Sequence, residues 1–169
     1  MTLRLFLAAC LAATCGLALR GAPTSGSFSG VTPFGWAYPV LASDDAGNSY
    51  LLLKESSSRI EFWKFDGTTW TSLPAITTAA TGDSGFSDDL GVAVDHLGNV
   101  HAVFRHYRGS GVTSTRGVKY GYYNGTSWSF QLLEEASCSS GCRNYNDPHI
   151  VVDRTGGAHV TYEFRESAT

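Results

Sequence analysis

One phrase recurs three times in this chain and constrains its fold more than any other feature. Residues 39–53, 90–104 and 148–162 each hold a short apolar run, an Asp-x-x-Gly turn and a second run of alternating character. The turn aspartates are Asp44, Asp95 and Asp153, at nearly regular intervals along the chain. Because an aspartate can accept hydrogen bonds from its own turn and glycine supplies a positive φ, each phrase predicts two antiparallel strands joined by a tight turn.

A second pair of phrases repeats in the same order. Residues 65–70 read FDGTTW, and residues 123–128 read YNGTSW, one repeat further along the chain. Asp-Gly and Asn-Gly are the dipeptides of tight hairpin turns, so we expect a third strand over 60–65 and 118–123 and a fourth strand after each turn. Four antiparallel strands in a unit of about 50 residues are typical of a β-propeller blade.

The repeats divide the chain into a lead-in and a series of units. We predict an all-β fold, with an irregular segment over 23–37 and a partial β-propeller over 38–169. Its predicted units are about 38–87, 88–145 and 146–169. The third unit supplies two strands of a blade, which gives about two and a half blades of four antiparallel strands and an incomplete ring. Propellers typically close with about 4 to 8 blades, so the chain is either a piece of a larger propeller or one of several chains assembled into one ring. We favour the first, because an evolved end rarely falls midway through a blade.

The N-terminal segment, 1–22, has the pattern of a secretory signal peptide. Arg4 precedes an apolar run over 5–19, and small polar residues follow from Gly21. This run is short for a membrane-spanning helix, which needs about 20 residues. The alternatives are an uncleaved anchor, a buried helix or lipidation of Cys10 in a lipobox-like Leu-Ala-Ala-Cys. We therefore expect a secreted or cell-surface protein with no membrane span once the signal is removed.

Export changes the meaning of the cysteines. After signal removal, Cys138 and Cys142 are the two that remain. Their glycine-containing loop can bring the sulfurs together, so we predict a local disulfide that shapes a loop. The alternative, a zinc site, needs two further ligands at suitable spacing, and the chain offers no second cysteine pair. No metal and no cofactor are expected.

Charge composition limits the class of partner. Charged residues make up 16% of the chain and the formal net charge is −3, with no stripe rich in lysine and arginine. This argues against nucleic acid as a partner.

The topology of a four-stranded sheet separates two kinds of connection. The turns after the first and third strands are tight and repeated here, whereas the other connections, predicted over 54–59, 77–89, 105–117 and 134–147, are long and differ between units. Variable loops on a rigid scaffold usually carry function, so we expect a ligand face at that end. Its candidate residues are Asp83, Asp88, Asp89, Arg105, His106, Tyr107, Arg108, Arg143, Asn144, Tyr145, Asn146 and Asp147.

The densest candidate cluster is Arg105-His106-Tyr107-Arg108. Guanidinium, carboxylate and aromatic groups suit a sugar, although solvated loops contain the same groups. The residues predicted to bind a ligand are Arg105, His106, Tyr107, Arg108, Asp88, Asp89, Asn146 and Asp147. His106 and Tyr107 are also candidates for catalysis, His106 as a general base, but no partner can be assigned to it from the sequence and the catalytic residues stay unknown.

Several other recurring residues favour a structural interpretation. His101 and His159 align with Tyr50, one strand position after each turn. We expect these side chains to pack, or to hydrogen bond, between neighbouring sheets. Trp70 and Trp128 recur in the hairpins and are expected in the core.

These phrases resemble the sialidase-like, or BNR-repeat-like, β-propellers of secreted bacterial proteins. The resemblance rests on SDDAGNSY (43–50), VDHLGNVH (94–101), VDRTGGAH (152–159) and the Asp/Asn-Gly-Thr-x-Trp hairpins. The first phrase is close to the Ser-x-Asp-x-Gly-x-Thr-Trp box of sialidases, whereas the other two depart from it. The Arg-Ile-Pro phrase that usually carries the first substrate-binding arginine of the family is absent.

The resemblance and the predicted ligand face lead to one functional expectation. We expect non-catalytic binding of a glycan, or of a cell-surface or extracellular protein. One alternative is a glycoside hydrolase or polysaccharide lyase whose site is completed by further blades. Another is a purely structural or adhesive repeat module on a larger surface protein.

Overall fold

The computed structural model describes residues 39–110, 114–138 and 143–166. All of them belong to the second of two compact units, Thr32–Thr169. The predicted signal peptide over 1–22, with Cys10, and the predicted lead-in over 23–37 lie outside the described residues, as does Cys142.

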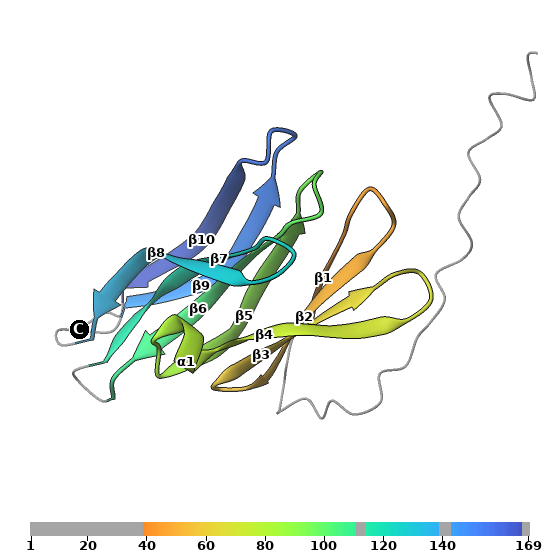
Figure 1. Cartoon of the computed structure of the whole chain (residues 1–169). Coiled ribbons are helices and arrows are strands. Elements are labelled where there is room, and N and C mark those ends of the chain that lie inside the picture. The colour runs from red at the N-terminus through yellow and green to blue at the C-terminus, as the bar shows by residue number, and fades with distance from the viewer. Residues whose placement is uncertain (1–38, 111–113, 139–142, 167–169) are drawn as a thin grey trace, which may run out of the picture. The chain divides into compact units, whose positions relative to one another are not determined.

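The described part of the chain is mostly strand, and all of its strand pairings are antiparallel (Figure 1). Sheet A holds β1 (Val40–Ser43), β2 (Ser49–Ser56), β3 (Arg59–Phe65) and β4 (Trp70–Thr77). Sheet B holds β5 (Gly85–Val94), β6 (Val100–Arg108), β7 (Thr115–Tyr123) and β8 (Trp128–Ser137). Sheet C holds β9 (Arg143–Val152) and β10 (Ala158–Glu166). The prediction of an all-β chain with four-stranded antiparallel sheets is confirmed, and none of these sheets is closed.

The repeated turns form as the sequence indicates. Asp95 Oδ1 accepts hydrogen bonds from the backbone N–H groups of Leu97 and Asn99, both at 2.9 Å. Gly98 follows with φ of 83°, a conformation that glycine adopts without the strain of a Cβ. Equivalent bonds form at Asp44 and Asp153. The recurring aspartates therefore build turns.

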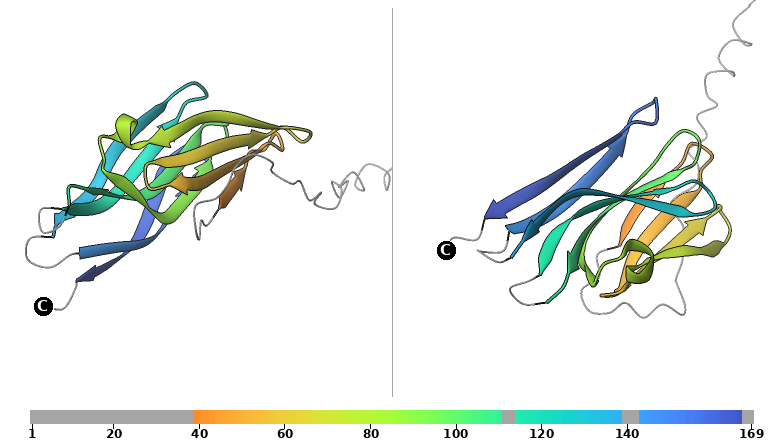
Figure 2. Two further views of the ribbon diagram at one scale, coloured as in Figure 1. Left: turned by 90° about the horizontal axis from the view of Figure 1, so that it is seen from below. Right: turned by 60° about the vertical axis from the view of Figure 1, so that its left-hand side comes forward.

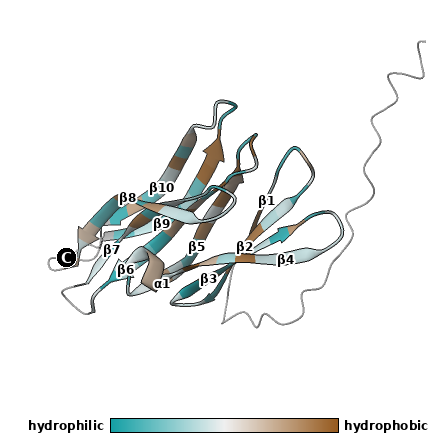
Figure 3. Ribbon diagram, viewed as in Figure 1, coloured by the Kyte–Doolittle hydropathy of each residue, from teal (hydrophilic) through white to brown (hydrophobic). Residues whose placement is uncertain are grey.

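Sheet B lies between the other two sheets (Figure 2). Val100, Ala102 and Phe104 face sheet A, in a buried cluster that includes Leu52 and Phe62. The alternate residue Val103 faces sheet C, in a second cluster with Val118, Tyr145 and Ile150. Because side chains alternate along a strand, the apolar run of β6 covers both faces of sheet B at once. The first strands of the sheets, β1, β5 and β9, contact one another in that order, and Figure 3 shows apolar stretches along them.

The tryptophans of the repeated hairpins differ in their surroundings. Trp128 packs against the cluster between sheets A and B, and its indole N–H donates to the carbonyl of Pro74 in sheet A at 2.7 Å. Trp70 lies against Phe65 in its own sheet, with ring centroids 5.1 Å apart. Trp128 thus joins two sheets, as a core position should.

The prediction of long loops at this end of the sheets needs correction. Strand pairing continues into them: β6 runs to Arg108, β5 starts at Gly85 and β9 starts at Arg143. β5 and β6 stay paired on both sides of a register shift between Phe86 and Leu90, so β5 includes residues that were predicted to lie in a loop. Most of the expected ligand-face residues therefore lie on strands rather than on loops.

A short helix, α1 (Thr78–Thr81), was also not predicted. The Thr77 side chain caps its first turn by accepting from the Ala80 N–H at 3.2 Å. Gly82, with φ of 72°, ends it. A single turn is too short to show a helical period in the sequence.

Candidate ligand-binding pocket

A pocket of about 520 Å³ lies at the end of the sheets away from the Asp-x-x-Gly turns. It gathers the end of β2, the start of β5, the end of β6 and the start of β7. Its lining residues are Lys54, Phe86, Ser87, Arg105, His106, Tyr107, Gly109, Ser110, Ser114 and Arg116. Three predicted ligand residues, Arg105, His106 and Tyr107, thus come together at one hollow.

The pocket is lined by cations, and the carboxylates that pair with them lie outside its lining. Lys54 forms an ion pair with Asp88, with Nζ 2.5 Å from Oδ1, and Arg105 pairs with Asp89. Arg116 donates to the Asn144 side-chain oxygen at 2.5 Å. Because that oxygen belongs to a neutral amide, this contact does not neutralise the Arg116 charge.

The ring of Tyr107 lies against the neighbouring strand at a glycine, which leaves room for it. Gly85 is the register partner of Tyr107 in the β5–β6 ladder. A Cβ at Gly85 would lie 2.1 Å from the Cζ and hydroxyl oxygen of Tyr107, so any larger residue would displace the ring. The aromatic wall of the pocket therefore depends on Gly85.

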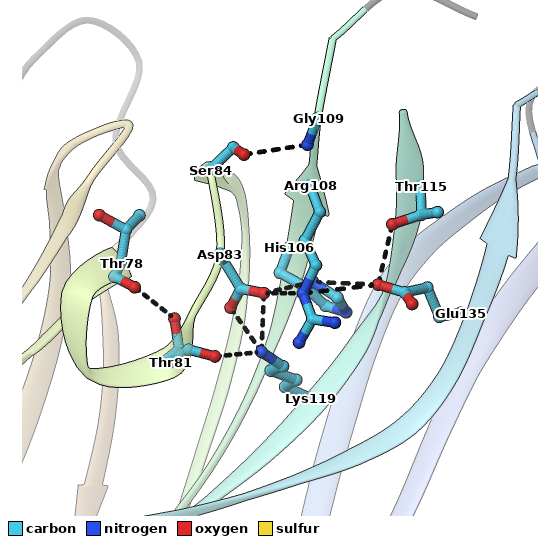
Figure 4. Close-up of polar contacts among 10 residues, drawn as sticks. All are labelled: Thr78, Thr81, Asp83, Ser84, His106, Arg108, Gly109, Thr115, Lys119 and Glu135. Carbon is cyan, nitrogen blue, oxygen red and sulfur yellow. Dashed lines mark hydrogen bonds and ion pairs between the residues drawn. The ribbon is translucent and has the colours of Figure 1, made fainter. Parts of the chain in front are cut away.

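A buried ionic cluster lies beside the pocket (Figure 4). The Asp83 carboxylate is fully buried, and its Oδ1 and Oδ2 accept from Lys119 Nζ at 2.7 and 2.8 Å. Arg108 Nε donates to Oδ1 at 3.1 Å. Lys119 Nζ also donates to the Thr81 carbonyl at 2.7 Å. The cluster thus ties the connection after α1 to the middle of sheet B.

The electrostatics of Asp83 follow from these contacts. Burial raises the pKa of Asp83, but the nearby His106 ring, the Lys119 ammonium and the Thr81 hydroxyl outweigh it and hold the pKa well below its usual range. The carboxylate is therefore ionised throughout the ordinary pH range. The role of Lys119 could not be predicted from the sequence, where it is a single charged residue within a predicted strand.

His106 is enclosed rather than presented to solvent. Its side chain is fully buried, with Nδ1 2.9 Å from Asp83 Oδ1 and 3.9 Å from Glu135 Oε1. Neither ring nitrogen makes a hydrogen bond of normal geometry within the described structure. On the other side, a Cβ at Gly117 would lie 2.8 Å from Nε2. A general base must reach its substrate, so this position does not favour the catalytic role considered for His106.

The other predicted site residues are distributed around this end. Asp88, Asp89 and Asp147 border a second pocket of about 340 Å³, together with Leu90, Pro148 and His149. Arg108 belongs to the buried cluster, and Asn146 pairs in register with Glu163 in sheet C. The structure therefore places six of the eight predicted ligand residues at two pockets, one cationic and one acidic.

Three more candidates lie on β9. Asn144 accepts from Arg116, and Tyr145 is buried and donates from its hydroxyl to Glu134 Oε1 at 3.3 Å. The side chain of Arg143 lies outside the described structure. Cys138 is disulfide-bonded, and its expected partner Cys142 is not among the described residues.

The two aligned histidines hydrogen bond within their own sheets, which corrects the expectation of bonds between sheets. His101 Nδ1 lies 2.7 Å from the Tyr120 hydroxyl, and its Nε2 lies 3.4 Å from Asp95 Oδ2. His159 Nε2 lies 3.0 Å from Asp153 Oδ2. The alignment therefore reflects a histidine that braces the preceding turn.

Neither a metal nor a membrane helix is indicated in the described residues. No group of three histidine, cysteine, aspartate or glutamate side chains there could hold a metal ion. Nor does any helix there have the length and apolar character to cross a membrane.

In comparison with known proteins, no family model matches the chain, and no curated protein matches it.

Proposed function

We propose that this chain is part of an exported, sialidase-like β-propeller that binds an acidic glycan without catalysing a reaction. The observation that carries the proposal is the pocket of about 520 Å³, lined by Lys54, Arg105 and Arg116 with no carboxylate among the described residues of its lining. A pocket of this size fits a sugar unit or two. Arg116, whose side chain contacts a neutral amide, gives this pocket a cation that can meet a negative charge.

The chemistry of the lining fits a carbohydrate. Guanidinium groups bind carboxylates and sulfates through paired N–H donors. The serine hydroxyls of Ser87, Ser110 and Ser114 suit the hydroxyls of a sugar ring. Tyr107, whose ring lies close to Gly85, offers an aromatic surface to the apolar face of a sugar. Catalysis is left out of the proposal because His106, the candidate base, is fully buried.

The propeller part of the proposal is supported by how the sheets repeat. Sheets A and B have the same strand order, sheet B packs on A, and sheet C packs on B. Their first strands contact one another in sequence, as the inner strands around a propeller axis would. Export is supported by the apolar N-terminal segment and by the disulfide bond of Cys138, since disulfides persist in oxidising compartments.

A glycan array containing neutral, uronate, sialylated and sulfated glycans tests the proposal. We expect binding to acidic glycans that weakens as salt is added, because salt screens charge. Arg116→Ala removes one charge-assisted contact and should weaken binding about tenfold or more. Arg154→Ala, in an exposed turn at the other end of sheet C, is the matched control and should bind like the wild type. Preference for neutral glycans, or equal loss in both variants, would refute the proposal.

A further inference from the structure

The contact between sheets A and B extends over their outer strands. Phe62 of β3 is fully buried, and its ring lies 5.1 Å from those of both Tyr123 and Trp128. The Trp128 indole N–H closes this contact by donating to Pro74 of β4. The outer half of sheet A is therefore covered by the β7–β8 hairpin of sheet B.

The same half of sheet B is open on the side that faces sheet C. Tyr120 precedes the hairpin glycine Gly125 by the same interval as Phe62 precedes Gly67, and so takes the equivalent position. In the described residues, sheet C has two strands where sheet B has four. A groove of about 310 Å³ lies here, lined by Tyr120, Gln131, Leu133, Ala158 and Val160.

The strand that borders the groove has an open edge. β10 pairs with β9 on one side, and no described strand pairs with it on the other. An edge of 9 residues offers backbone N–H and C=O groups to an added strand. The groove and the edge lie together, because Ala158 and Val160 belong to both.

We propose that the β10 edge and this groove form a docking site for a β-hairpin with the chemistry of β7–β8. Its first strand pairs with β10, and its aromatic side chains fill the groove against Tyr120 and Leu133. The argument is continuity with the A–B interface, in which Tyr123 and Trp128 fill the equivalent place over Phe62. The inference concerns an interaction surface and does not depend on glycan binding.

A docked hairpin can be distinguished from other ligands by its need for free backbone amides and for aromatic side chains. An added strand requires free amides, whereas a purely apolar ligand does not. A hairpin of this kind also requires the two aromatic residues that cover Phe62 in sheet A. A second copy of the folded chain is disfavoured for antiparallel pairing of two β10 edges. The two-fold axis is then perpendicular to the joined sheet and brings both copies of sheet B to one side of it, where their outer strands compete for the same space.

The test uses the full chain and a synthetic peptide with the sequence of residues 115–137, labelled with a fluorophore. We expect saturable binding by fluorescence anisotropy and slower amide hydrogen exchange in β10. A peptide with N-methylated amides along its first strand should not bind, nor should one in which both Tyr123 and Trp128 are replaced by alanine.

Two variants of the protein locate the site. Ala158→Arg fills the groove from an exposed position and should weaken peptide binding at least tenfold. Val151→Arg adds the same side chain on β9, where Val151 is 64% exposed and outside the groove lining, and should leave binding unchanged. Absence of binding, protection at β4 or β8 instead of β10, or concentration-dependent protection of β10 without peptide would overturn the proposal. The last outcome would identify a second copy of the chain as the occupant.

Discussion

At the scale of single residues, the Asp83 carboxylate is a fully buried charge held by several partners. It lies in full burial beside a lysine that is itself almost fully buried. A buried ion pair adds little over an apolar pair of equal shape, yet removal of one partner leaves the other charge uncompensated. The contribution of Asp83 to the free energy of unfolding is therefore measured when Asp83 is replaced and Lys119 is kept.

Asp83→Asn should lower the free energy of unfolding by about 3–5 kcal/mol at neutral pH, since Lys119 loses its counter-charge. The double variant Asp83→Asn with Lys119→Met should recover part of that loss. Urea unfolding at neutral pH measures both. Asp66→Asn is the matched control, because Asp66 makes turn hydrogen bonds that Asn124 makes in the equivalent hairpin. A loss in the control as large as in Asp83→Asn would contradict this account.

The lowered pKa of Asp83 also sets the direction of its pH dependence. An unfolded aspartate takes up a proton at about pH 3.9, the ordinary pKa of its side chain. The folded carboxylate stays ionised to lower pH. Acid thus favours the unfolded state, and the stability due to Asp83 is present above about pH 4 and lost below it. Unfolding measured from about pH 5 down to about pH 3 should show a shallower decline for Asp83→Asn than for the wild type.

At the scale of elements, the close packing of β7 against its neighbours β6 and β8 depends on one glycine. Gly117 is the register partner of His106, and a Cβ there would lie 2.2 Å from the Glu134 carbonyl oxygen. Backbone atoms cannot move aside as a flexible side chain can. The close approach of β7 and β8 at this point therefore excludes any other residue.

Gly117→Ala should destabilise the protein by about 1–3 kcal/mol through overpacking. Gly121→Ala, in the same strand, is the comparison: its Cβ would contact the Trp128 and Phe130 rings at 3.3 Å, so a smaller loss is expected. Thermal or urea unfolding of the two variants side by side checks the order. The reverse order would show that the rings are the harder obstacle.

The elements also show what the sequence could predict and what it could not. Turn dipeptides and Asp-x-x-Gly phrases are local, so the hairpins at Gly67, Gly98 and Gly125 were predicted correctly. The extension of β6 through Arg108 was not, because it depends on pairing with β5 and β7, which a local pattern does not report. For the same reason the pocket was predicted in part, through Arg105, His106 and Tyr107, while Lys54 and Arg116 were missed.

At the scale of the three described sheets together, sheet B is buried on both faces and sheet C on one. Val103 and Phe104 are adjacent in β6 and both are almost fully buried, because sheet B has a neighbour on each face. Sheet C has a neighbour on one described face, and Val151 on the other is 64% exposed. A sheet with both faces covered loses more apolar contact on opening than a sheet with one.

This inequality predicts the order in which backbone amides exchange with solvent. Amides of β6 should exchange slowest, with opening free energies near the global value, because opening β6 disrupts both apolar clusters. Amides of β10 should exchange faster than those of β6, since one ladder holds β10 and two hold β6. Native-state hydrogen exchange read by mass spectrometry measures both. If β10 were as protected as β6 in the isolated chain, its edge would already be covered, and the open groove described above would not be a docking site.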